Sequence, residues 1–145
     1  MQKKNPVVHF EIPYADRDRM VAFYEKAFGW ESQKLGPEMG NYVVMTTAEM
    51  DPETKFPKTP GQINGGFYQK TDDPISQYPS VVVAVDDIRE SIQKVKAAGG
   101  TVRTQSGTEE PDDIPGVGLF VSVIDTEGNR ISMLQPYPMM ETRPQ

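Results

Sequence analysis

The sequence predicts an α+β fold built from two copies of one strand–helix–three-strand unit. Three observations support this fold class: short segments alternate apolar with polar residues, two segments carry apolar residues at helical spacing and end at glycine, and the order of these segments occurs twice in the 145 residues. Three successive strands after each helix favour α+β over a parallel α/β sheet, in which strands and helices alternate one for one.

The first unit begins with a strand at residues 7–13. Its alternation places Phe10 and Ile12 on one face and His9 and Glu11 on the other. A helix follows, and the spacing predicts that its apolar face contains Met20, Phe23, Tyr24, Ala27 and Phe28, with Asp16 as N-cap and Gly29 as the stop. A core position for Phe23 predicts that Phe23→Ala lowers the free energy of unfolding by about 2–5 kcal/mol.

Three more strands are expected in the first unit, at residues 30–35, 41–47 and 62–69. A turn containing Gly36, Pro37 and Gly40 joins the first two, and a long loop at 48–61 precedes the third. The third contains Gly65-Gly66. Two adjacent glycines inside a strand indicate a bulge or a close approach by a ligand or by another part of the backbone.

The same order then repeats after an Asp- and Pro-rich linker. A strand at 80–85 leads to a helix capped by Asp86 or Asp87 and ended by Gly99-Gly100, with further strands at 101–105, 118–124 and 130–135 and an acidic loop at 106–116. The sequence therefore predicts a single domain over residues 1–145, with module one at about 6–70, a linker at 71–78 and module two at about 79–137.

Composition excludes several classes of function. The chain has no cysteine, so disulfide scaffolds, thiolate metal sites and cysteine nucleophiles are excluded. A formal net charge of −6 disfavours nucleic acid as a partner. No apolar run is long enough to span a membrane, and no apolar segment follows Lys3 and Lys4 as a signal peptide requires. We expect a cytoplasmic protein with no nucleic-acid or membrane partner.

Several motifs resemble the vicinal oxygen chelate superfamily, which includes glyoxalases, bleomycin-resistance proteins and extradiol dioxygenases. The motifs are His9–Pro13, Ala27–Trp30, Ile63–Gly66, Val85–Ile88 and Asp125–Ile131, where Thr126 replaces the usual proline. Their order covers nearly the whole chain. The resemblance implies that the two βαβββ modules form a curved mixed sheet shaped as a cup with helices outside, that two chains pair as a homodimer, and that both modules donate ligands to one divalent metal.

The metal site implied by this resemblance is expected to be degenerate. The first-strand ligand position matches His9, but the corresponding positions of module two are Ser80 and Ser132, and the last strand of module one offers Asn64 or Gly65. A neutral serine hydroxyl is a poor ligand for Zn²⁺ or Fe²⁺, and a single histidine cannot supply the two that an extradiol dioxygenase needs. We therefore predict no metal ligands and no cofactor. The alternative is a divalent metal held weakly at His9, with help from Glu11.

The resulting prediction is a metal-independent protein that binds a small, cationic or polar organic molecule. The expected ligand-binding residues are His9, Glu11, Tyr42, Asn64, Phe67, Ser80 and Ser132. Three alternative hypotheses stay open beside this prediction. His9 and Glu11 could be catalytic in a lyase, an isomerase or a dioxygenase-related enzyme, with burial raising the pKa of Glu11. They could be ordinary exposed strand residues, with the aromatic side chains in the core. The cup could be filled by the chain itself or by a partner chain.

Overall fold

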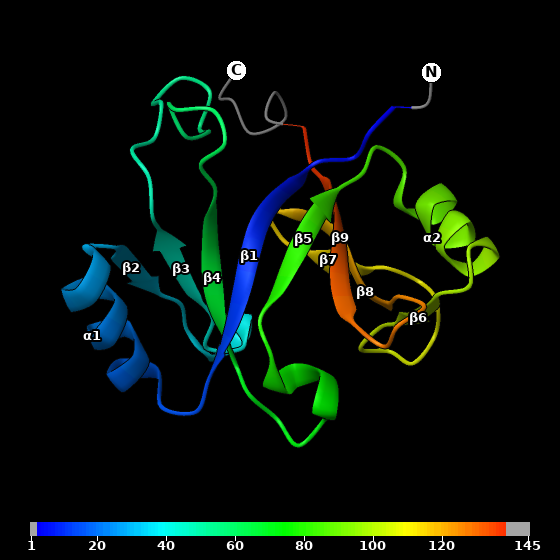
Figure 1. Ribbon diagram of the computed structural model, residues 1–145, viewed down its shortest axis with the longest axis horizontal. Helices are drawn as coiled ribbons and strands as arrows, with labels where there is room; N and C mark the ends of the chain where they lie inside the picture. The colour runs from blue at the N-terminus through cyan, green and yellow to red at the C-terminus, as the bar shows by residue number, and fades with distance from the viewer. Residues whose placement is uncertain (1–2, 139–145) are drawn as a thin grey trace. The chain divides into compact units, whose positions relative to one another are not determined.

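The computed structural model describes residues 3–138 and divides them into two compact units. One unit comprises Val8–Ser80, and the other comprises the chain from Val81 onward together with the segment that ends at Val7. Each unit contains a β-sheet and one α-helix (Figure 1). The boundary between Ser80 and Val81 lies next to residue 79, where the sequence predicts the start of module two.

The first unit has the predicted order of one strand, one helix and three strands. Its sheet runs β2–β3–β4–β1, in which β1 and β4 are parallel and the other neighbours are antiparallel. The elements are β1 (Val7–Tyr14), α1 (Arg17–Phe28), β2 (Glu31–Lys34), the 3-10 helix η1 (Pro37–Met39), β3 (Val43–Thr46), β4 (Asn64–Gln69) and the 3-10 helix η2 (Pro74–Gln77).

Both predicted ends of α1 are confirmed. The Asp16 carboxylate accepts a hydrogen bond of 3.0 Å from the Arg19 amide, which satisfies one of the free N–H groups of the first turn. Gly29 follows the helix with φ 73°, a left-handed conformation, and donates its N–H to the Glu25 carbonyl. Glycine adopts this conformation without the steric penalty of a Cβ, so the chain can leave the helix and enter β2.

The core of the first unit lies between α1 and one face of its sheet (Figure 1). Because side chains alternate along a strand, Phe10, Ile12 and Tyr14 of β1 share the face that packs against α1. The buried residues of this core are Tyr14, Val21, Val43, Met45 and Phe67.

The prediction that Phe23 and Phe28 belong to this core is wrong. Phe23 is 58% exposed and Phe28 is 62% exposed, and α1 buries only Val21 completely. Phe23 follows Val21 by two residues, which is about 200° around an α-helix, so its ring points away from the sheet. It packs on the surface against the edge of Tyr24, with ring centroids 5.0 Å apart.

The paired glycines of β4 make room for two side chains on opposite faces of the sheet. A Cβ on Gly65 would lie 2.5 Å from the Phe10 ring, on the face towards α1. A Cβ on Gly66 would overlap the hydroxyl of Tyr42 on the other face. The sequence therefore identifies a close approach correctly, but side chains of the same unit make it, not a ligand or backbone.

The second unit repeats this order with one additional short strand. Its sheet runs β5–β9–β8–β6, and β7 pairs with β8. The elements are β5 (Ser80–Ala84), α2 (Ile88–Ala97), β6 (Thr101–Arg103), β7 (Asp112–Ile114), β8 (Gly118–Ile124) and β9 (Arg130–Pro136). Strand β7 lies in the segment expected to be a loop. It is acidic and short, so local propensity gives no sign of the antiparallel partner that holds it.

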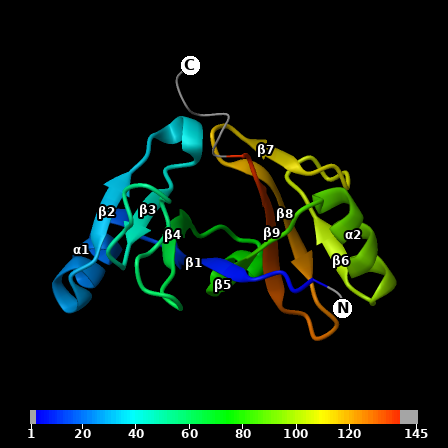
Figure 2. The ribbon, with the colours of Figure 1, turned by 90° about the horizontal axis from the view of Figure 1, so that it is seen from above.

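Helix α2 covers one face of its own sheet, as Figure 2 shows. Asp87 is the N-cap and accepts from the Glu90 amide at 3.1 Å, and the Gln135 side chain accepts from the Ile88 amide at 2.9 Å. The buried core is Val85, Ile88, Ile92, Val121, Val123 and Met133. The α+β class and the repeated modules are confirmed. No helix in residues 3–138 is long and apolar enough to cross a membrane.

Candidate functional site in the first unit

The sheet face opposite the core of the first unit carries its polar side chains. His9 and Glu11 alternate with the core residues of β1 and therefore point away from α1. Tyr42 directly precedes β3, and its hydroxyl lies over Gly66, the residue that pairs with Glu11 in the β1–β4 register. Three polar side chains from two separate segments thus meet on one face.

These three side chains form a hydrogen-bonded group, which we call the polar cluster: His9, Tyr42 and Glu11. His9 Nε2 and Tyr42 Oη lie 2.8 Å apart. The Tyr42 hydroxyl also hydrogen-bonds the Glu11 carboxylate. Glu11 is only 8% exposed, so its carboxylate is held in a largely desolvated position. The sequence prediction that His9 and Glu11 share a face is confirmed, and Tyr42 connects them.

Burial sets the proton affinities within the polar cluster. Burial raises the pKa of Tyr42 well above its ordinary value of 10.0, and the negative charge of Glu11 and its hydrogen bond raise it further. Burial lowers the pKa of His9 below its ordinary value of 6.5. At neutral pH the phenol is therefore protonated and the imidazole is uncharged, so the cluster offers neutral donors and acceptors beside one carboxylate.

The turn before β3 fixes the position of Tyr42. The Leu35 amide donates to the Tyr42 carbonyl at 2.8 Å, and the Tyr14 hydroxyl donates to the Asn41 carbonyl at 2.7 Å. Arg17 Nη1 donates to the Leu35 carbonyl at 3.0 Å. Asn41 itself has φ 55°, a conformation that asparagine tolerates better than most residues. The Asn41 carbonyl is thus tied to β1, and the Tyr42 carbonyl is tied to α1 through Leu35.

The lowered pKa of His9 predicts a pH dependence of stability. The unfolded chain binds a proton on His9 more readily than the folded chain does, because burial lowers the pKa of His9 below 6.5. The contribution of His9 to the free energy of unfolding should therefore be fully present above pH 6.5 and should be lost as the pH falls below it. Urea denaturation between about pH 5 and 7.5 measures this slope. Since His9 is the single histidine, His9→Gln should flatten the profile in this window. An unchanged slope in that variant would assign the effect to other groups.

Asn64 lies beside His9 in the β1–β4 register but serves the long loop. Its side-chain oxygen accepts from the Thr47 amide at 2.7 Å and from the Ala48 amide at 3.2 Å, and its side-chain nitrogen donates to Met50 Sδ at 2.7 Å. The amide thus anchors the first residues after β3. It was predicted to contact a ligand; in the structure its polar atoms are already used for this anchoring.

Asn64→Leu is expected to destabilise the start of this loop. It leaves the Thr47 and Ala48 amides without their acceptor, which costs roughly 1–3 kcal/mol in total. Hydrogen exchange should show both amides losing protection. Asn64→Asp is the matched control, because it keeps an acceptor oxygen and should protect both amides. Equal loss of protection in the two variants would contradict an anchoring role for that oxygen.

Two further residues predicted to bind the ligand are also placed by the first unit. Phe67 is fully buried on the face towards α1, with its ring 5.2 Å from the Tyr24 ring, so its assignment to a ligand site is wrong. Gly66 is the partner of Glu11 in the β1–β4 register, and Phe67 follows Gly66 by one position. Because successive residues of a strand point to opposite faces, Phe67 lies on the face opposite Glu11. Ser80 is 8% exposed, and its hydroxyl has no hydrogen-bond partner within residues 3–138.

Ser132 belongs to the second unit and is fully buried there. It pairs with Ser122 across β8 and β9, and the two hydroxyl oxygens lie 3.2 Å apart. A role for Ser80 and Ser132 in ligand binding stays a prediction.

The donor atoms do not fit the divalent metal that the family resemblance implies. His9 Nε2 and the Glu11 carboxylate both hydrogen-bond Tyr42, and Ser132 pairs with another hydroxyl. Within residues 3–138, no group of three or more His, Cys, Asp or Glu side chains is arranged to hold a metal ion. Structural and catalytic zinc sites need at least three such ligands. We therefore derive no chemistry through a metal.

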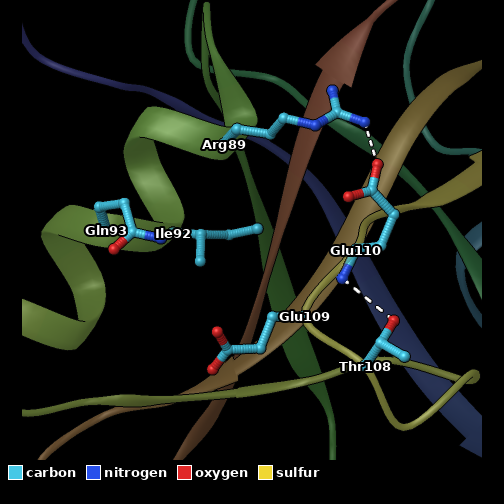
Figure 3. Close-up of a pocket in the computed structure, with 6 residues that line it drawn as sticks. All are labelled: Arg89, Ile92, Gln93, Thr108, Glu109 and Glu110. Atoms are coloured by element: carbon cyan, nitrogen blue, oxygen red, sulfur yellow. Dashed lines mark hydrogen bonds and ion pairs between the residues drawn. The ribbon is translucent and has the colours of Figure 1, made fainter.

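A shallow cavity of about 430 Å³ in the second unit is less suited to a specific ligand. It lies between α2 and the acidic loop, where the Arg89 guanidinium points at the Glu110 carboxylate and forms an ion pair with it (Figure 3). Lys96 and Glu109 form a second ion pair, at 2.7 Å. All four side chains are substantially exposed, and such pairs contribute little energy. We therefore place the candidate site at the polar cluster.

The bridging role of Tyr42 is not apparent from the sequence, which predicts this residue only as a ligand contact. The one available signal was Gly66, because a glycine inside a strand often marks a side chain lying close above it. The sequence prediction also missed the anchoring role of Asn64. Asparagine is rare inside strands, so its place at the start of β4 could have indicated a side-chain hydrogen bond to nearby backbone.

Comparison with known proteins adds a family model and two longer relatives. Residues 7–48 match the model described as bleomycin resistance protein-like N-terminal. The chain is 30% identical over 122 residues to "Putative glyoxylase CFP32" of Mycobacterium tuberculosis, covering 83% of this chain and 40% of that protein. It is 27% identical over 124 residues to "Probable lactoylglutathione lyase, chloroplastic" of Arabidopsis thaliana, covering 85% and 33%. The chain thus spans about a third to two fifths of these relatives.

Solved structures with the same fold extend over nearly the whole chain. Methylmalonyl-CoA epimerase from Mycobacterium tuberculosis aligns with a TM-score of 0.64 and 13% identity, covering 99% of this chain and 97% of that one. A glyoxalase/bleomycin resistance protein/dioxygenase superfamily member from Vibrio splendidus aligns with a TM-score of 0.53 and 15% identity, covering 91% and 99%. At these identities the likeness establishes the fold.

Proposed function

The chain belongs to the vicinal oxygen chelate superfamily, and on that premise we propose that it is a metal-independent small-molecule binding protein. Its binding group is the polar cluster of His9, Tyr42 and Glu11. The first unit supplies this cluster on a rigid sheet face, with the core and α1 behind it. A few convergent polar groups on an otherwise apolar scaffold are typical of ligand sites.

The hydrogen bonding of His9 and Glu11 to one phenol is the observation that carries this proposal. A metal site would leave the imidazole lone pair and the carboxylate directed at a common point. Here Tyr42 Oη stands between them, 2.8 Å from His9 Nε2 and hydrogen-bonded to Glu11. The cluster therefore has the polarity of an organic ligand site, with a carboxyl group beside a neutral phenol and a neutral imidazole.

A screen of small organic molecules by thermal shift, followed by titration of each hit, tests the proposal. Tyr42→Phe and Glu11→Gln should each weaken a true hit by about tenfold or more, because each removes a hydrogen-bonding or charged group at the binding site. Arg89→Ala, in the cavity of the second unit, is the control and should leave affinity unchanged. A hit weakened only by Arg89→Ala, or a screen without hits, would overturn the proposal.

The alternative function is an acid–base enzyme, either a lyase or an isomerase. The names of the relatives favour it, since one is called a lyase and a fold neighbour is called an epimerase. The uncharged imidazole of His9 beside a carboxylate suits proton transfer. If a substrate is found, turnover that stops in His9→Ala while binding persists would favour the enzyme over the binding protein.

The homodimer implied by the superfamily remains part of this proposal. Size-exclusion chromatography with light scattering should give about twice the 16.2 kDa chain mass. A single species at the chain mass would rule the homodimer out.

A further inference from the structure

The donor and the acceptor of each hydrogen bond in the polar cluster can be assigned by counting protons. A phenol has one proton to donate, and an ionised carboxylate can only accept. With Glu11 ionised, its carboxylate accepts the hydrogen bond that joins it to the Tyr42 hydroxyl. The phenol proton is therefore donated to Glu11. The Tyr42 oxygen then has only lone pairs left for its second partner.

That second partner is His9 Nε2, 2.8 Å from Tyr42 Oη. Since the Tyr42 oxygen can only accept there, Nε2 must carry a proton. In a neutral imidazole the other nitrogen, Nδ1, then has an unprotonated lone pair. The hydrogen bonds thus run from Nε2–H to the phenol and from the phenol to the carboxylate.

The Nδ1 atom of His9 faces away from the hydrogen bond to Tyr42, because it is the other nitrogen of the ring. No hydrogen bond within residues 3–138 is assigned to it, and it is not one of the buried side-chain atoms in this range that lack a partner. His9 is only partly buried, so we treat Nδ1 as open to a molecule from solution. Gly66 supports this arrangement, since its missing Cβ is what lets the Tyr42 hydroxyl reach the level of His9 and Glu11.

We infer that Tyr42 is a positioning residue that holds His9 as the Nε2–H tautomer, so that Nδ1 accepts a hydrogen bond from the ligand. The ligand class is thereby an organic hydrogen-bond donor, of which a protonated amine is one. This inference rests on the proposed function. It goes further by naming the ligand atom type and the residue that determines it.

Nitrogen-15 NMR of the uniformly labelled, untagged chain tests the tautomer directly. His9 is the single histidine, so both ring nitrogens are assigned without ambiguity. Near pH 7.5 we expect Nε2 to resonate as the protonated nitrogen and Nδ1 as the unprotonated one. The opposite tautomer would reverse the direction of the hydrogen bonds and overturn the inference.

Two phenylalanine variants separate positioning from general structure. Tyr42→Phe removes the acceptor for Nε2–H, and the ring nitrogens should then show a mixture of tautomers. Tyr68→Phe is the matched control, because the Tyr68 hydroxyl donates to the carbonyls of Ser76 and Tyr78, at 3.1 and 2.9 Å. It should leave the His9 spectrum unchanged. A single Nε2–H tautomer that persists in folded Tyr42→Phe would contradict a positioning role.

Benzylammonium and benzoate, which are similar in size and opposite in charge, test the ligand class. Benzylammonium should shift the Nδ1 resonance in a saturable way, and benzoate at the same concentration should not. A response to benzoate alone, or to neither probe, would overturn the assignment of a donor ligand. Failure of the binding proposal is distinguishable, because it is measured by the small-molecule screen, whereas the tautomer is measured without any ligand.

Discussion

Phe67→Ala should lower the free energy of unfolding by about 3–5 kcal/mol, the range for removing a buried aromatic ring. Phe67 has no exposed surface and lies in the core of the first unit with Val43 and Met45. Its ring also contacts Tyr24 of α1, with centroids 5.2 Å apart. Alanine would leave a cavity between the sheet and the helix, and the surrounding strands can close it only in part.

Phe23→Ala is the matched control for this measurement. The same change is made in the same unit, but Phe23 is 58% exposed, so it should cost roughly 1 kcal/mol or less. Chemical denaturation monitored by circular dichroism gives both values. Equal losses in the two variants would mean that Phe23 is part of the core, as its helical spacing alone suggested.

Gly66→Ala should lower the free energy of unfolding by about 1–3 kcal/mol through overpacking. The new methyl group would overlap the Tyr42 hydroxyl and displace it from His9 and Glu11. Backbone strain is not the cause, because Gly66 is not one of the glycines with positive φ. The variant should therefore lose the tautomer preference of His9 together with stability.

A double-mutant cycle with Tyr42→Ala isolates this contact. In the Tyr42→Ala background, the Tyr42 ring atoms that the new methyl group would overlap are absent. Alanine is then favoured over glycine inside a strand by roughly 0.5–1 kcal/mol. Gly66→Ala should thus destabilise the natural chain but stabilise the Tyr42→Ala chain. The same destabilisation in both backgrounds would place the steric conflict elsewhere.

The order of elements could be predicted because each rests on local signals. Alternation marks β1, and the caps Asp16 and Gly29 mark both ends of α1, so neither needs tertiary information. Strand β7 could not be predicted in this way, because Asp112–Ile114 becomes a strand only through its pairing with β8. The buried side of α1 was misjudged at Phe23 because aromatic residues occupied more of the helix surface than the sheet can cover.

The candidate site was predicted in part for the same reason. The faces of His9 and Glu11 follow from alternation along one strand. The bridge by Tyr42 depends on the β3–β4–β1 register, which joins residues 33 positions apart and has no local signature. Phe67 was assigned to the wrong face because its assignment rested on residue type, and the register of its strand was not known from the sequence.

The most direct test of the account is the metal content and metal affinity of the untagged protein. Elemental analysis of the purified chain, with titration of Zn²⁺, Ni²⁺, Mn²⁺ and Fe²⁺ followed by thermal unfolding, measures both. Because His9 Nε2 and the Glu11 carboxylate are both engaged with Tyr42, and no third ligand is arranged beside them in residues 3–138, we expect no stoichiometric metal and no shift in Tm with any of the four ions. One tightly bound ion per chain that raises the Tm, and no longer does so in His9→Ala, would contradict the account and restore a metal-dependent lyase or dioxygenase.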